Sequence, residues 1–174
     1  MIGEDEAGGF PSRYLAQFGV ENIGITRKYT SYRWFAEVAG TSADVLKSTV
    51  LYNGAYRNGI YKSGYTYEGR IIGHGLDNDA LVFSAGLILV NAKGDSWQLL
   101  GRMGELNRVG PDPIHSVAIL PQDLASIEIQ HGRDTKFGRF DLGLGYEQRE
   151  ELASGDDSSE VRAFVRWTSP LPSL

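Results

Sequence analysis

The sequence predicts an all-β fold, an antiparallel transmembrane β-barrel of eight strands with a polar lumen. Three observations support this prediction. Apolar and polar residues alternate with a period of two over many short stretches, which is the pattern of strands with one apolar face. Lysine occurs only between these stretches, and the large aromatic residues lie near their ends. Eight strands of roughly 9–11 residues, with their loops, fit a chain of 174 residues.

The composition excludes several classes of protein. With 41% hydrophobic and 22% charged residues, the chain can build a core, and we expect residues 1–174 to form a single β-barrel domain. It has no Cys, which excludes a disulfide framework and a thiol nucleophile. The net charge of −5 argues against a nucleic-acid partner, because the phosphate backbone attracts basic surfaces. No apolar run approaches the roughly 20 residues of a membrane-spanning helix.

The first two strands are predicted within 12–21 and around position 34. One face of the first carries Tyr14, Ala16, Phe18 and Val20. Around position 34, Trp34, Ala36 and Val38 alternate with Arg33, Phe35 and Glu37. Each stretch therefore has one apolar face.

Three strands are predicted in the middle of the chain. One lies within 65–73, one at 79–91 is apolar on both faces, and one at 96–107 begins with Trp97. Residues 91–95 have the Asn, Gly and Asp of a tight turn. The long segment 43–66 does not fit a strict alternation of short turns and long loops. It is either a further pair of strands or a segment folded into the lumen.

The last three strands are predicted around 127, at 139–147 and at 159–168. The clearest alternation gives one face with Phe140, Leu142, Leu144 and Tyr146. Residues 134–136 form a tight turn, whereas 108–122 and 148–158 are long and polar. Short turns on one side and long loops on the other are typical of outer-membrane barrels. A closed barrel requires the first and last strands to pair with each other.

Alternation also fits a soluble β-barrel or sandwich, whose inner apolar face binds a small apolar ligand. Two residue sets favour the membrane barrel. Arg and carboxylates on the polar strand faces suit a narrow lumen, where they pair as an ionic plug: Arg33, Glu37, Glu128, Arg139, Asp141, Glu147, Arg162 and Arg166. Aromatic residues are expected to form two membrane girdles: Tyr14, Trp97 and Trp167 on the short-turn side, and Tyr32, Trp34 and Tyr146 on the opposite side.

Several blocks of the sequence resemble the Wzi family of capsule-assembly outer-membrane proteins. They are residues 2–21, the tyrosine-rich stretch 52–74 around Gly69-Arg70, and parts of 77–108. The resemblance covers nearly the whole chain, but only the C-terminal part of the family's larger barrel. It implies a bacterial outer-membrane location and a non-catalytic role in assembling or retaining capsular polysaccharide. The partners are then the lipid bilayer, or detergent in its place, and the polysaccharide.

The N-terminus is acidic and has no apolar stretch, so it is not a secretory signal. Together with the partial resemblance, this start predicts a fragment or engineered piece of a longer protein. One expectation for such a piece is that it keeps only the ability to fold and insert.

A polysaccharide site needs aromatic faces for sugar rings. The candidates are Tyr52, Tyr56, Tyr61, Tyr65 and Tyr67. The alternative is that these tyrosines pack their segment against the barrel.

His74, Asp77 and Asp79 suggest a weaker alternative, an outer-membrane hydrolase, or else a calcium loop. Their stretch lacks the Gly and distal Glu of an EF-hand, and a polar turn explains it more simply. His115 and His131 are isolated in sequence and are expected to be structural. We therefore expect no catalytic residue, no metal ion and no cofactor.

Overall fold

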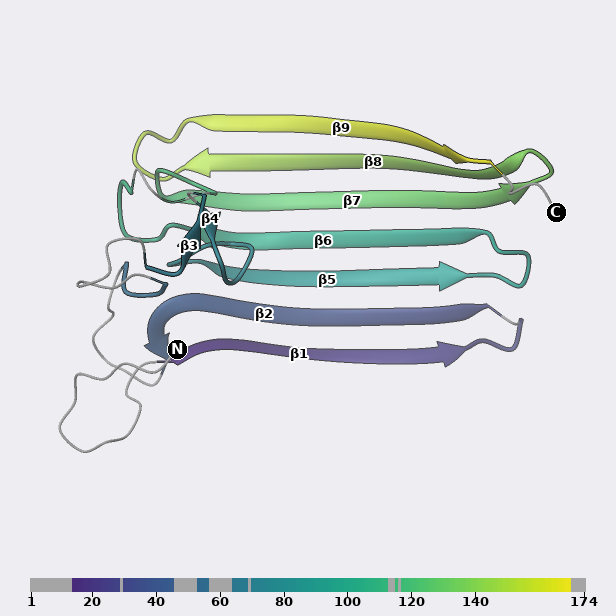
Figure 1. Cartoon of the computed structure of the whole chain (residues 1–174), viewed down its shortest axis with the longest axis horizontal. Helices are drawn as coiled ribbons and strands as arrows, with labels where there is room; N and C mark the ends of the chain where they lie inside the picture. Colours follow the sequence, from purple (N-terminus) through teal and green to yellow (C-terminus); the bar gives the residue numbers. More distant parts are fainter. Residues whose placement is uncertain are drawn as a thin grey trace.

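The computed structural model describes residues 14–28, 30–45, 53–56, 64–68, 70–112, 115 and 117–169, and in Tyr14 and 43–45 only the backbone. Its main feature is one seven-stranded antiparallel sheet in the order β1-β2-β5-β6-β7-β8-β9 (Figure 1). The strands are β1 (Tyr14–Ile25), β2 (Ser31–Val45), β5 (Leu81–Val90), β6 (Ser96–Leu106), β7 (Gln122–Thr135), β8 (Gly138–Glu151) and β9 (Asp157–Thr168). No helix occurs in the described residues, so none there is long and apolar enough to cross a membrane. The predicted all-β antiparallel class is confirmed.

The connections between neighbouring strands lie at two ends of the sheet (Figure 1). The connections 26–30, 91–95 and 136–137 lie at one end, which we call the short-turn end. The connections 46–80, 107–121 and 152–156 lie at the other, which we call the loop end. The two predicted tight turns are confirmed: Asn91 Oδ1 accepts from the backbone N of Lys93 at 2.8 Å, and Thr135 Oγ1 accepts from that of Phe137 at 3.1 Å. The long connection after β2 lies with the other long connections.

The eighth strand expected within 65–73 is not part of the main sheet. Residues there form a separate two-stranded sheet of β3 (Thr66–Tyr67) and β4 (Arg70–Ile71). The expected loop 148–158 is also shorter than predicted, because β8 continues to Glu151.

The expected closure through 12–21 and 159–168 is not found. In the part of the chain that is described, β1 and β9 are the edges of the sheet and do not pair with each other. Seven strands that reverse direction at each step leave β1 and β9 running the same way (Figure 1). A direct pair between them would therefore be parallel, whereas bacterial barrels of this type have an even number of antiparallel strands.

The strand register separates the sheet into two faces. We call apolar face the even-numbered residues of 18–24, 32–38 and 140–146 with the odd-numbered residues of 83–89, 97–103, 125–131 and 161–167. The residues that alternate with these along each strand form the polar face. One row across the apolar face runs Trp34, Leu87, Leu99, Ile129 and Leu144. The sheet thus has a continuous apolar surface on one side.

In the central strands β7 and β8 the apolar face is more exposed than the polar face, whereas the edge strands β1 and β9 are largely exposed on both faces. In β8, which lies between β7 and β9, Leu142 and Leu144 of the apolar face are 49% and 53% exposed, whereas Asp141 of the polar face is 7% exposed. Gly143 and Gly145 of the polar face are also buried. A soluble barrel or sandwich has the reverse arrangement, because its apolar face lines the core.

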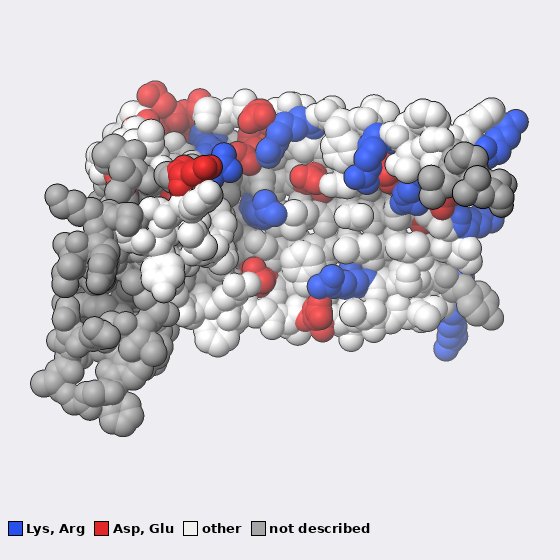
Figure 2. All heavy atoms as spheres, viewed as in Figure 1, with Lys and Arg blue, Asp and Glu red and all other residues white. Residues whose placement is uncertain are grey.

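A small apolar core lies at the loop end. Ala80, Val82, Leu106, Ala118 and Leu124 are buried there, and Leu76 and Val117 pack against them. The described lysines, Lys28, Lys93 and Lys136, occupy the three short turns. Figure 2 shows basic side chains at the short-turn end of the sheet, on the right. Lys47 and Lys62 lie outside the described residues.

Candidate functional site

The polar face carries two ionic clusters near the β8–β9 edge. In the first, Asp141 accepts hydrogen bonds from Arg139 Nε at 3.0 Å and from Arg166 Nη2 at 3.0 Å. Arg139 of β8 also donates to Ser96 Oγ of β6 at 2.7 Å, across the intervening strand β7. Cross-strand pairing places these groups together, since Asp141 is opposite Arg166 in β9 and Gly132 in β7. Gly132 leaves the space that the arginine head needs: a Cβ there would collide with Arg139 Nη2.

The second cluster is centred on Glu147. Its carboxylate accepts from Arg149 Nε at 2.8 Å and from Arg162 Nη2 at 2.9 Å. Arg149 Nη1 also donates to the carbonyl of Val117 at 3.2 Å, so this cluster ties the sheet to the loop end. Farther across the face, Glu128 accepts from Gln130 Nε2.

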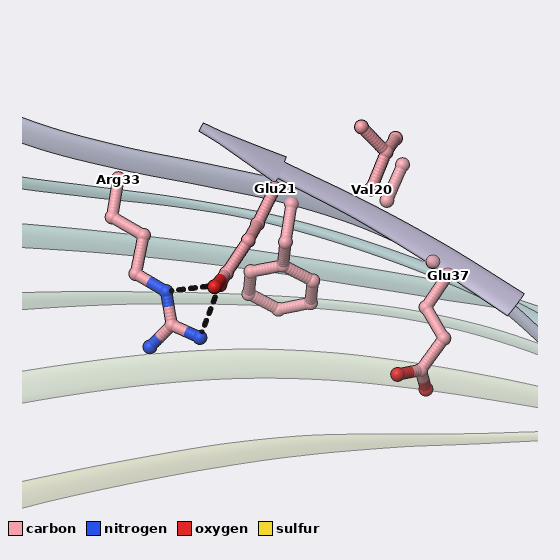
Figure 3. Close-up of a pocket in the computed structure, with 7 residues that line it drawn as sticks. Val20, Glu21, Arg33 and Glu37 are labelled. Carbon is pink, nitrogen blue, oxygen red and sulfur yellow. Dashed lines mark hydrogen bonds and ion pairs between the residues drawn. The ribbon is translucent and has the colours of Figure 1, made fainter. Parts of the chain in front are cut away.

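A hollow lies on the polar face over β1 and β2 (Figure 3). Its volume is about 330 Å³. It is lined by Gly19, Val20, Glu21, Arg33, Phe35, Ala36 and Glu37. Glu21 Oε2 accepts from Arg33 Nε at 2.9 Å and Nη2 at 2.7 Å, and Glu37 Oε2 accepts from Gln17 Nε2 at 2.7 Å. The labelled side chains of Glu21, Arg33 and Glu37 extend to the same side of the sheet in Figure 3.

All eight residues expected in the lumen network lie on the polar face. The structure brings five of them together in two groups, Arg139 with Asp141 and Arg166, and Glu147 with Arg162. Arg33, Glu37 and Glu128 instead bind residues that sequence analysis did not select. The partners that were missed, Glu21 and Gln17, belong to the hairpin of β1 and β2. The first strand was predicted to end at position 21, whereas β1 continues to Ile25, so the pairing of the two strands could not be predicted. That these groups line a lumen stays a prediction.

The expected rims of three aromatic residues are wrong. Tyr14 begins β1 at the loop end, whereas Tyr32 and Trp34 lie near the start of β2 at the short-turn end. Tyr32 pairs with Leu89, which pairs with Trp97, so Tyr32 and Trp97 share one row. The extra strand counted within 65–73 caused the error, because it reversed the first two strands relative to the rest.

The remaining aromatic candidates lie on the apolar face. Trp97 and Trp167 are at the short-turn end, and Tyr146 is nearer the loop end. Trp97 stacks on His131 with ring centroids 4.2 Å apart. Trp167 Nε1 donates to the carbonyl of Phe137 at 2.9 Å. Contact of these rings with a membrane stays a prediction.

Three of the five candidate tyrosines are described, and Tyr52 and Tyr61 lie outside the described residues. Tyr56 packs on Gly73, and its hydroxyl oxygen accepts from the backbone N of His74 at 3.1 Å. Tyr65 donates its backbone N–H to the carbonyl of Tyr56 at 2.8 Å. The side chains of Tyr65 and Tyr67 are free of such packing, with exposures of 64% and 68%. The segment thus contains one structural tyrosine and two exposed ones.

Polar residues at the loop end form a buried cluster that ties the connections together. Its members are the buried residues Thr41, Asp77, Asn78, Asp79, Asn107 and His115 and the half-buried Asn53. Asp79 Oδ2 accepts from the backbone N of Asn53 at 2.7 Å, and Asn107 Nδ2 donates to the carbonyls of Ala118 and Ile119, both at 3.0 Å. Asp77, Asp79 and Asn107 have positive φ angles of 66°, 52° and 48°, a conformation that Asp and Asn adopt more readily than most residues.

The histidine of this cluster has a structural role. His115 Nδ1 accepts from the backbone N of Val117 and of Ala118, at 3.2 and 3.0 Å. Nε2 therefore carries the proton and donates to the carbonyl of Asn78 at 3.0 Å. The side chains of His115 and Asp77 have no exposed surface. In the described residues no group of three or more His, Asp or Glu side chains could hold a metal ion.

The comparisons with known proteins give one match. The family model described as "Capsule assembly protein Wzi" matches residues 1–159, which include β1 to β8 and the first residues of β9. No curated protein and no solved structure matches the chain. Since the matched residues make up most of the 174, the chain belongs to the capsule assembly protein Wzi family.

Proposed function

We propose that this chain forms part of the wall of an outer-membrane β-barrel that assembles or retains capsular polysaccharide at the bacterial surface. The apolar face contacts lipid and the polar face lines the lumen. Residues 1–174 act as a single domain, and the role includes no catalytic step. Family membership supports the location and the capsule role.

One observation carries the membrane part of the proposal: in the central strands β7 and β8 the apolar face is the more exposed one. Soluble monomers rarely expose contiguous apolar patches larger than a few hundred Å², whereas here the apolar face extends over seven strands. The shortest of these strands, β5, has 10 residues. At about 3.4 Å per residue and a tilt of about 45°, ten residues span about 24 Å, close to the apolar band of outer-membrane barrels.

The capsule part of the proposal is placed at the loop end. Long loops of bacterial barrels face the cell exterior. Tyr65 and Tyr67 are exposed in the longest connection at this end, and aromatic rings of this kind stack on sugar rings. We propose that they contact the polysaccharide, together with Tyr52 and Tyr61 of the same connection, whereas Tyr56 holds the segment through Gly73 and His74.

The test is made in an encapsulated bacterium that carries the gene for this chain. Deleting the gene should move polysaccharide from the cell-associated fraction to the medium. A Tyr65→Ala/Tyr67→Ala double variant should release several-fold more polysaccharide than the parent, with the same amount of protein in the outer membrane. Ile72→Ala is the matched control, since Ile72 is an exposed apolar residue of the same segment, 60% exposed. An unchanged distribution after gene deletion contradicts the capsule role.

A further inference from the structure

The hollow over β1 and β2 has the composition of a carbohydrate subsite. Its volume of about 330 Å³ lies within the range of small-molecule sites. It lies on the polar face and is distant in sequence from the tyrosines proposed to contact capsule. Two of its residues, Arg33 and Glu37, belong to the set expected to form an ionic plug, and that expectation assigns no ligand to the hollow.

The centre of the hollow is an aromatic ring. Phe35 is the one aromatic residue among the polar-face residues of β2, where it pairs with Gly86 of β5. Its ring rests on that glycine, because a Cβ at position 86 would collide with Phe35 Cε1. Glycine thus allows the ring to lie against the sheet, and Phe35 still lines the hollow. The Arg33 guanidinium carbon also lies over the ring, 6.0 Å from the ring centroid, so a sugar would share this aromatic surface with Arg33. An aromatic ring held in this way is a platform for the apolar face of a sugar.

Hydrogen-bonding groups flank the ring on both sides. Arg33, Phe35 and Glu37 occupy alternate positions of β2, so they share one face at intervals of about 6.8 Å. Both Arg33 donors bind the same oxygen of Glu21, Oε2, and Gln17 binds Oε2 of Glu37. The Oε1 atoms of Glu21 and Glu37 have no recorded donor within the described part of the chain, and each can accept from a hydroxyl. The Arg33–Glu21 pair is half exposed, at 50% and 52%, so a ligand can reach it.

The charge of the hollow selects the class of sugar. Two carboxylates, Glu21 and Glu37, face one guanidinium, Arg33, which leaves one negative charge in excess. An excess carboxylate repels a uronic acid but accepts hydrogen bonds from neutral sugars. We propose that this hollow is a subsite for neutral hexopyranose units, with Phe35 as the stacking platform and Glu21, Arg33 and Glu37 as the polar contacts. The proposal rests on the proposed function, in which polysaccharide contacts this protein.

The experiment uses the full chain folded in micelles of a detergent without a sugar headgroup. Binding of maltohexaose, cellohexaose, isomaltohexaose and hexagalacturonate is measured by calorimetry. We expect at least one neutral hexasaccharide to bind, and hexagalacturonate to bind at least tenfold more weakly. Phe35→Ala should weaken the neutral sugar at least tenfold, and Phe35→Tyr should keep its affinity within about twofold. Glu37→Gln should narrow the preference for the neutral sugar, because it removes the excess charge.

Phe164→Ala is the matched control. Phe164 covers Gly143 as Phe35 covers Gly86, but it does not line the hollow. Its loss should leave sugar binding unchanged. Binding of none of the neutral sugars, equal loss in Phe35→Ala and Phe164→Ala, or tighter binding of hexagalacturonate overturns the subsite. Because lipid contact and capsule release are measured separately, failure here with those results intact rejects the subsite alone.

Discussion

Asp141 is the residue on which two arginines of the polar face converge. Its side chain is 10% exposed, and Arg139 and Arg166 both donate to it. Asp141→Ala leaves two cations without their carboxylate in a covered site. We expect it to lower the free energy of unfolding by about 1–3 kcal/mol, measured by urea titration in micelles. This loss is smaller than the roughly 3–5 kcal/mol of a broken buried pair, because Arg166 is 66% exposed.

Glu160→Ala is the control for Asp141→Ala. Glu160 pairs with Arg162 at 4.0 Å on the same face, and its side chain is 65% exposed. Such a pair contributes roughly 0–1 kcal/mol. Equal urea midpoints for parent and Asp141→Ala would contradict the structural role of the cluster, as would loss of sugar binding in the folded variant.

Gly143 is required by the ring that lies over it. A Cβ at this position would collide with Phe164 of β9, whereas a Cβ at Gly145 would meet Glu128 Cγ at 3.8 Å, an ordinary contact. Gly143→Ala should destabilise the protein by about 1–3 kcal/mol, because the ring must move. Gly145→Ala should change the free energy of unfolding by less than about 0.5 kcal/mol. An equal loss of unfolding free energy in both variants would show that the collision with the Phe164 ring is not the cause of the destabilisation.

At the residue scale, the sequence predicted which face each charged residue occupies, since a period of two is sufficient for that. It did not predict partners. The residue opposite Arg33 is Ile23, and Glu21 lies two residues from it on the same face of β1. This register, set by the turn 26–30, allows Glu21 to bind Arg33 diagonally across the two strands. Turn geometry and register are properties of paired strands, and they are not visible in either strand alone.

At the element scale, a substitution in β8 can show whether the apolar face contacts lipid or water. Leu144 is 53% exposed at the centre of this strand's apolar face. If this face contacts lipid, Leu144→Arg should cost about 2–4 kcal/mol. The measurement is the urea midpoint in liposomes or micelles. Leu152→Arg is the matched control, since Leu152 is 49% exposed in the connection after β8 and should tolerate the charge. A tolerated Leu144→Arg contradicts lipid contact.

Most of the seven long strands were predictable from a period of two bounded by turn residues, whereas β5 was predictable from its nearly uninterrupted apolar run. The false strand within 65–73 came from a short tyrosine- and isoleucine-containing stretch that forms only the hairpin β3–β4. Local pattern does not distinguish a strand of the main sheet from a hairpin in a loop, because both alternate. That one error also inverted the rims of Tyr14, Tyr32 and Trp34.

At the scale of the whole molecule, the two ends of the sheet differ in charge and in structure. The short-turn end carries the described lysines, and the loop end carries the buried polar cluster and the exposed tyrosines. The edges β1 and β9 run in the same direction, so an antiparallel closure needs an odd number of additional strands between them. In our proposal the sheet is therefore one part of the wall of a barrel, and further strands complete it.

The three tryptophans provide the most direct test of the claim that the apolar face contacts lipid. Trp34, Trp97 and Trp167 are all on this face, 41%, 48% and 58% exposed, and all lie towards the short-turn end. The chain is reconstituted in phospholipid vesicles brominated either near the headgroup or near the chain ends, and tryptophan fluorescence is measured. Our account predicts strong quenching by bromine near the headgroup, weaker quenching by deep bromine, and little quenching by aqueous iodide. Efficient iodide quenching without any effect of brominated lipid would contradict it.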